Sequence, residues 1–197
     1  MNRSILDKHL KKLTSELAEM GSLVEKQIYD SIKALKNNDL KLADQAIKND
    51  DKVDELNRRI EEKCIIYMAT ESPLATDLRK MFATSKIVTD LERIADYAVD
   101  IAKIAKRVEV DPLGEAEVPL WNMVDILSRM INMSIEAFVN GDIDMAYEIC
   151  KLDDEVDTIY QALFKDHLKK MTKDESLVNK GTRILFVSKY LERMGDH

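Results

Sequence analysis

The chain is poor in the residues that make turns and sheets. Its 197 residues include only five glycines and three prolines, and aromatic residues make up 6% of the total. A sheet protein with many tight turns needs more of these residues. By contrast, 34% charged and 45% hydrophobic residues are typical of long helices that bury one face. We therefore expect a globular, all-α protein.

The chain also lacks an excess of positive charge, a long hydrophobic run and clustered cysteines. Its net charge of −7 offers no basic surface for nucleic acid. No apolar run is long enough to span a membrane, and residues 1–12 mix charged and apolar side chains, so neither a membrane anchor nor a signal sequence is expected. Cys64 and Cys150 have no second Cys or His nearby for a thiolate metal site, and we expect both to be buried thiols in a reducing cytoplasm.

Apolar residues recur at intervals of three and four along six stretches, which is typical of helices with one apolar face. The first such stripe runs through Leu6, Leu10, Leu13, Leu17, Met20, Val24, Ile28, Ile32 and Leu35. Breaks separate the stretches at 37–39, 72–73, 111–114, 140–142 and 172–174. Short connections make neighbouring helices antiparallel. We therefore predict two antiparallel three-helix bundles, residues 1–110 and 115–197, with a boundary at Asp111–Gly114.

An internal repeat relates the two halves. Residues 91–96 (LERIAD) return as residues 191–196 (LERMGD), a step of 100 positions. Residues 50–54 (DDKVD) return as residues 153–157 (DDEVD), a step of 103 positions. Two copies of this length predict two bundles related by pseudo-symmetry.

Four carboxylate pairs, each spaced by four residues, occupy equivalent places in the repeat. These pairs are Asp50/Asp54, Glu92/Asp96, Asp153/Asp157 and Glu192/Asp196. Acids at this spacing share one helix face, and they repel by a few tenths of a kcal/mol unless a cation joins them. Pairs of acids at this spacing are about as frequent in the chain as chance predicts. The informative observation is that these four pairs occupy equivalent positions in the repeat.

In each half, the two pairs lie beside the apolar stripes of consecutive helices. If those sides face each other, four carboxylates converge, and Asp100 lies one turn further along. Such a set of oxygen ligands suits iron, manganese, magnesium or zinc. The alternative is a solvated surface on which Arg58, Arg93 and Lys103 neutralise the acids. The residues alone leave both interpretations open.

Longer segments around these pairs are more specific than the spacing. Pro73–Arg79 leads into Asp90–Asp96, and Tyr190–His197 forms the matching part of the second copy. In these segments, and over nearly its whole length, the chain resembles the PhoU family of phosphate-signalling proteins. The resemblance implies two three-helix bundles that bind multinuclear metal clusters, iron or zinc among them. The implied ligands are Asp50, Asp54, Glu92, Asp96 and Asp100 in the first bundle and Asp153, Asp157, Glu192 and Asp196 in the second.

The resemblance also implies a function. It is that of a cytoplasmic, non-enzymatic negative regulator of phosphate uptake and of the phosphate-starvation response. The implied partners are the ATPase subunit of the phosphate ABC transporter and a sensor histidine kinase. A homodimer is expected, and the protein would reach the membrane only through its partners.

The chain departs from the family pattern in three places. Tyr97 stands where the family often has the histidine that His197 supplies in the second copy. Arg79 has no basic counterpart in the second copy. The first copy continues helically through Asp100 to about Arg107, whereas the sequence stops at His197, so the last helix reads as truncated. We expect this to make the second metal site the weaker one.

Other interpretations of the acids fit less well. A ferritin-like di-iron oxidase needs Glu-x-x-His, and no glutamate stands three residues before His9, His167 or His197. A calcium-binding EF-hand needs a loop glycine, which residues 50–54 and their surroundings lack. A metal-free helical adaptor and a carboxylate-bridged di-metal enzyme remain as alternatives.

Overall fold

The computed structural model describes residues 3–107 and 117–197, and helices account for nearly all of them. The elements are α1 (Arg3–Asn37), α2 (Leu40–Thr70), α3 (Ala75–Lys106), α4 (Glu117–Asn140), α5 (Ile143–Met171), a 3-10 turn η2 (Glu175–Leu177) and α6 (Val178–Asp196). The two described ranges contain six α-helices and no strand. The all-α prediction and the order of the helices are confirmed.

Two short turns join consecutive helices by the same device. Asn38 adopts a positive φ of 53° and Gly141 a positive φ of 69°, which reverse the chain after α1 and α4. The next residue is an aspartate in both turns. Asp39 accepts hydrogen bonds from the amides two and three residues ahead, at 3.0 Å each, and Asp142 accepts one from Met145 at 2.9 Å. These side chains satisfy amides that the first helical turn leaves unpaired, so each new helix begins at a defined residue.

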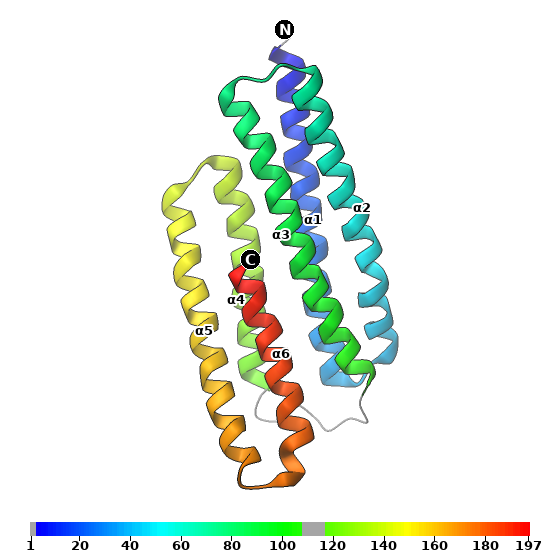
Figure 1. Ribbon diagram of the computed structural model, residues 1–197, viewed down its shortest axis with the longest axis vertical. Coiled ribbons are helices and arrows are strands. Elements are labelled where there is room, and N and C mark those ends of the chain that lie inside the picture. The colour runs from blue at the N-terminus through cyan, green and yellow to red at the C-terminus, as the bar shows by residue number, and fades with distance from the viewer. Residues whose placement is uncertain (1–2, 108–116) are drawn as a thin grey trace.

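The six helices form two antiparallel three-helix bundles that lie side by side (Figure 1). The first bundle consists of α1, α2 and α3, and the second consists of α4, α5 and α6. The bundles meet where α1 packs against α4 and α3 packs against α6. The arrangement of two pseudo-symmetric bundles is the one predicted. The predicted boundary at Asp111–Gly114 lies outside the described residues, between the end of α3 and the start of α4.

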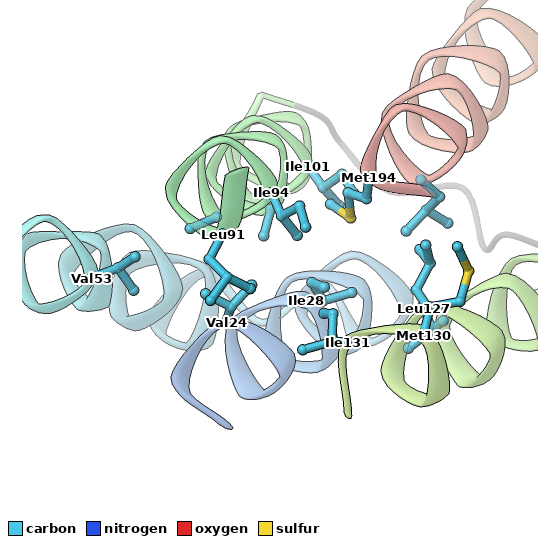
Figure 2. Packing of buried hydrophobic residues seen from close by; sticks show 14 of the residues in the cluster. Val24, Ile28, Val53, Leu91, Ile94, Ile101, Leu127, Met130, Ile131 and Met194 are labelled. Atoms are coloured by element: carbon cyan, nitrogen blue, oxygen red, sulfur yellow. The ribbon is translucent and has the colours of Figure 1, made fainter. Parts of the chain in front are cut away.

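The apolar core continues from one bundle into the other. Figure 2 shows Ile28 of α1 near Ile131 of α4, and Ile101 of α3 near Met194 of α6. Their exposed fractions are 6% or less, and all belong to one cluster of buried residues. The repeat predicted two bundles but did not predict that they share a core. The shared core fixes the position of one bundle against the other.

The expectation for the two cysteines is half right. Cys64 is buried, and burial raises the pKa of its thiol to about 11. The prediction of a buried Cys150 is wrong, because this residue is exposed on α5. An apolar spacing along a helix identifies a face, but whether that face is covered depends on where the neighbouring helix lies.

Replacing Ile28 with alanine should lower the free energy of unfolding by about 2–5 kcal/mol, because the cavity would open at the junction of the two bundles. Ile28 is only 1% exposed. Ile65→Ala is the matched control, since Ile65 is 63% exposed and its change should stay within about 0.5 kcal/mol. Urea unfolding followed by circular dichroism measures both. Equal losses in the two variants would contradict the shared core.

Candidate metal centre

The first carboxylate cluster consists of Asp50 and Asp54 on α2 and Glu92 and Asp96 on α3. Burial raises the pKa of Asp50, and the charges of Asp54 and Asp96 raise it further. Burial raises the pKa of Glu92, and the other three acids add to the shift. The pKa of Asp96 is raised by burial and then by Asp54. The structure therefore brings these four acids of two helices into one electrostatic cluster.

The packing of α2 on α3 holds these acids together. Val53 is fully buried and Leu91 is 5% exposed, and each is the chain neighbour of one acid in the cluster. Figure 2 shows both side chains on the inner sides of their helices. Because the apolar residues must face the core, the acids beside them lie at the edge of the same helix–helix contact.

A third helix contributes to the first cluster through Gln27, which the sequence analysis missed. The Gln27 side chain is fully buried on α1. Its Nε2 donates to the carbonyl of Ala46 at 3.1 Å and to Oδ1 of Asp50 at 3.2 Å, while its Oε1 is buried without a hydrogen-bond partner. A polar residue within the apolar stripe of the first helix is the signal that could have identified it.

Asp100 is tied to a cation of its own helix. Its Oδ1 accepts a hydrogen bond from Lys103 Nζ at 3.0 Å. Lys103 thus neutralises one predicted ligand, as the salt-bridge interpretation expected. Arg58 and Arg93 form no ion pair with the first cluster in the part of the chain that the structure describes. Glu92 and Asp96 thus have no ion-pair partner among the described residues, although the charge of Arg93 partly offsets the raised pKa of Glu92 and that of Lys103 partly offsets the raised pKa of Asp96.

The second cluster consists of Asp153 and Asp157 on α5 and Glu192 and Asp196 on α6. Burial raises the pKa of Asp153, and the other three acids of this cluster raise it further. Oδ1 of Asp153 is buried and has no hydrogen-bond partner. The repeat-related acids thus converge in the second bundle as well, again from two helices.

Basic side chains already pair with two acids of the second cluster. Lys189 Nζ contacts both carboxylate oxygens of Glu192, Oε1 at 2.6 Å. Arg193 Nη1 lies 3.5 Å from Asp196 Oδ2. The two clusters are therefore similar in their acids but different in the cations around them.

The chemistry of both clusters fits a metal ion, but their side chains are not gathered into a finished ligand cage. Carboxylate oxygens suit hard and borderline cations, and the unpartnered Oδ1 of Asp153 is an available acceptor. Across residues 3–107 and 117–197, no group of three or more His, Cys, Asp or Glu side chains stands close enough to hold a metal ion. Carboxylates repel one another in the absence of a cation, which favours such an open arrangement.

His197 contacts the first bundle. Its Nδ1 is 3.4 Å from Oδ1 of Asp90, and its ring centroid is 6.0 Å from that of Tyr97. Tyr97 also stacks on Tyr190, at 5.8 Å between centroids. The residues at the two repeat-related positions 97 and 197 thus meet where α3 passes α6.

None of the helices that the structure describes combines the length and the apolar character needed to cross a membrane.

Comparison with known proteins identifies the repeat. The family profile described as the PhoU domain matches residues 17–105 and again residues 120–197. The two matches correspond to the two bundles, and together they cover more than half of the chain.

Curated relatives match over nearly the whole chain. A phosphate-specific transport system accessory protein PhoU homolog of Clostridium acetobutylicum is 47% identical over 100% of this chain and 90% of its own length. The protein of the same name from Rhizobium meliloti is 33% identical over 98% of this chain and 82% of its own length.

Two solved structures share the fold. The crystal structure of PhoU from Pseudomonas aeruginosa has a TM-score of 0.90 at 32% identity and covers 97% of this chain and 92% of its own. The phosphate transport system regulatory protein PhoU from Streptococcus pneumoniae has a TM-score of 0.88 at 27% identity, with 97% and 90% covered.

In the absence of metal, the double variant Glu92→Gln/Asp96→Asn should be more stable than the parent at neutral pH. The pKa values of both carboxyls are raised in the folded protein, so the folded state holds their protons more tightly than the unfolded chain does. As the pH rises from acidic to neutral, these carboxyls ionise less readily in the folded protein than in the unfolded chain, and this difference lowers the stability of the parent. The stability advantage of the variant should therefore shrink towards acidic pH.

Urea unfolding in chelator, from acidic to neutral pH, measures this difference. Asp144→Asn/Glu148→Gln is a control with the same spacing, because both of its acids are exposed on α5. The control should not gain stability at neutral pH. A variant of the first cluster that is no more stable than the parent would contradict the repulsion.

Proposed function

The chain belongs to the PhoU family, and from this membership we propose that it is a metal-binding negative regulator of phosphate uptake and phosphate-starvation signalling. It acts by protein contacts and not by catalysis. Its partners are the ATPase subunit of the phosphate ABC transporter and a sensor histidine kinase. The names of the relatives, an accessory protein and a regulatory protein of phosphate transport, support this role.

The observation that carries the metal part of the proposal is the duplicated convergence of acids. Burial raises the pKa of Asp50 and of Asp153, and the neighbouring acids of each cluster raise it further. A bound cation would remove this repulsion and would lock α2 to α3 and α5 to α6. The ligands in the first bundle are Asp50, Asp54, Glu92, Asp96 and, after release from Lys103, Asp100; those in the second are Asp153, Asp157, Glu192 and Asp196. Iron or zinc in a multinuclear cluster is the proposed cofactor.

Exposed apolar side chains at the start of α3, including Leu74 directly before it, support a role in protein contacts. Leu74, Leu78 and Phe82 are spaced by four residues and are 61%, 44% and 58% exposed. A row of large apolar residues on one helix face is typical of an interaction surface. We also propose that the protein works in the cytoplasm as a homodimer, since two similar bundles offer two similar faces.

Replacing Glu92 and Asp96 with Gln and Asn should lower the metal content of protein purified without chelator, because two of the proposed oxygen ligands lose their charge. Elemental analysis of the parent and the variant measures this. Asp144→Asn/Glu148→Gln should keep the metal content of the parent. If the parent itself carries no metal, the metal-free helical adaptor takes the place of the metal-binding regulator.

Deleting the gene should switch on phosphate-scavenging genes in phosphate-rich medium, because a negative regulator would be lost. A reporter for such a gene measures the effect, and a plasmid copy of the parent should restore repression. Repression that persists in the deletion strain, together with no binding to the ATPase or to the kinase, would refute the regulatory assignment.

A further inference from the structure

The two carboxylate clusters differ at three positions that the repeat makes equivalent. A step of 103 residues relates Gln27 to Met130, and a step of 100 relates Thr89 to Lys189 and Ala95 to Gly195. Gln27 and Met130 lie on α1 and α4, and the other four residues lie on α3 and α6, the helices that carry the glutamates of the clusters. The four acids of each cluster are of the same types, so differences in their surroundings distinguish the two clusters.

Lys189 forms an ion pair with Glu192, whereas the equivalent Glu92 of the first cluster has no ion-pair partner in the part of the chain that the structure describes. Its ammonium contacts both oxygens of Glu192, whose side chain is only 12% exposed, and it also lies 5.1 Å from the ring of Tyr160. The equivalent Thr89 donates its hydroxyl to the carbonyl of Ser85 at 2.9 Å. No ion pair reaches Glu92 or Asp96 within the described residues.

The buried donor of the first cluster is also missing from the second. Gln27 holds Asp50 by a hydrogen bond of 3.2 Å, whereas Met130, which is 6% exposed, offers no donor. The Asp153 side chain instead packs against the backbone of α6 at Gly195. A Cβ atom added to this glycine would lie 2.6 Å from Oδ1 of Asp153. In the first cluster a buried amide thus orients Asp50, and Glu92 has no ion-pair partner among the described residues. In the second cluster Oδ1 of Asp153 has no hydrogen-bond partner, and Glu192 is paired with Lys189.

These differences have opposite consequences for a metal ion. In the first cluster, a cation meets Glu92 and Asp96, which have no ion-pair partner among the described residues, and Asp50, which Gln27 already orients. Binding by these acids relieves repulsion and breaks no ion pair, and only recruitment of Asp100 would break its pair with Lys103. In the second cluster, a cation can use Glu192 only after the contact with Lys189 is broken. Separating a largely buried carboxylate from its ammonium partner costs free energy that the metal ion must offset.

We propose that the clusters are unequal cation sites, in which the first takes up a divalent cation directly and the second is closed by Lys189, which acts as a built-in cation that metal must displace. This inference rests on the proposed metal binding. It adds that Lys189 lowers the affinity of the second cluster and that loading is sequential, first bundle before second.

The test is a titration of the full chain with Mn²⁺, an ion that prefers oxygen ligands and whose free form is counted by electron paramagnetic resonance. The first cluster is silenced with Asp50→Asn/Glu92→Gln, so that the second is measured alone. In this background, Lys189→Met removes the ammonium but keeps the apolar stem beside Tyr160. Lys180→Met on the same helix is the matched control, and Lys189→Arg keeps the charge. Circular dichroism verifies that each variant is folded.

Lys189→Met should tighten Mn²⁺ binding at the second cluster about tenfold, the usual size of an effect from a residue next to the metal ligands. Lys180→Met and Lys189→Arg should bind like the background protein. Equal affinity of Lys189→Met and Lys180→Met would overturn the inference, while two-site binding by the parent would leave the proposed metal function standing. No binding by the parent would overturn both.

Discussion

Burial of the apolar stripes between adjacent helices is the interaction on which the rest of this structure depends. A fully buried Val or Leu contributes about 1.5–3 kcal/mol, whereas two like charges one turn apart cost only a few tenths of a kcal/mol. Val53 and Leu91 are such residues, and each lies next to an acid of the first cluster. Core packing can therefore hold α2 and α3 in a register that forces carboxylates together. The repulsion persists in the folded protein as raised pKa values.

The duplication adds a second constraint, because two bundles share one core. The contact of α1 with α4 and of α3 with α6 buries residues such as Ile28 and Met194. Each bundle therefore supports the other, and the two carboxylate clusters are held at fixed positions in one body. A cation that locks α2 to α3 acts on α3, which is also a helix of the junction. The proposed metal binding in the first bundle would therefore act on a helix that also contacts the second bundle.

The two copies have diverged around their acids and not at them. A buried amide orients the acid of one copy, and an ammonium group neutralises an acid of the other. With the proposed unequal affinities, the two sites of this regulator would respond at different concentrations of the same ion. Leu78 and Phe82 of the exposed apolar row lie on the same helix as Glu92 and Asp96, so a change in that helix would reach a surface suited to a partner.

The sequence by itself determined the local structure of this protein. Spacing of apolar residues by three and four specifies a helix, and residues such as Asp39 and Gly141 specify where helices begin and end, because these effects act within one or two turns. The repeat also showed which acids are equivalent. Only the tertiary structure decided that Gln27 reaches Asp50, that Lys189 pairs with Glu192 and that Cys150 is exposed. The first contact joins residues 23 positions apart, and the exposure of Cys150 depends on which helix covers it. Even the Lys189 pair, three residues apart, required the helix to present both side chains at the edge of a packed contact. Periodicity along one helix identifies its faces, but the packing of all six helices determines which faces meet.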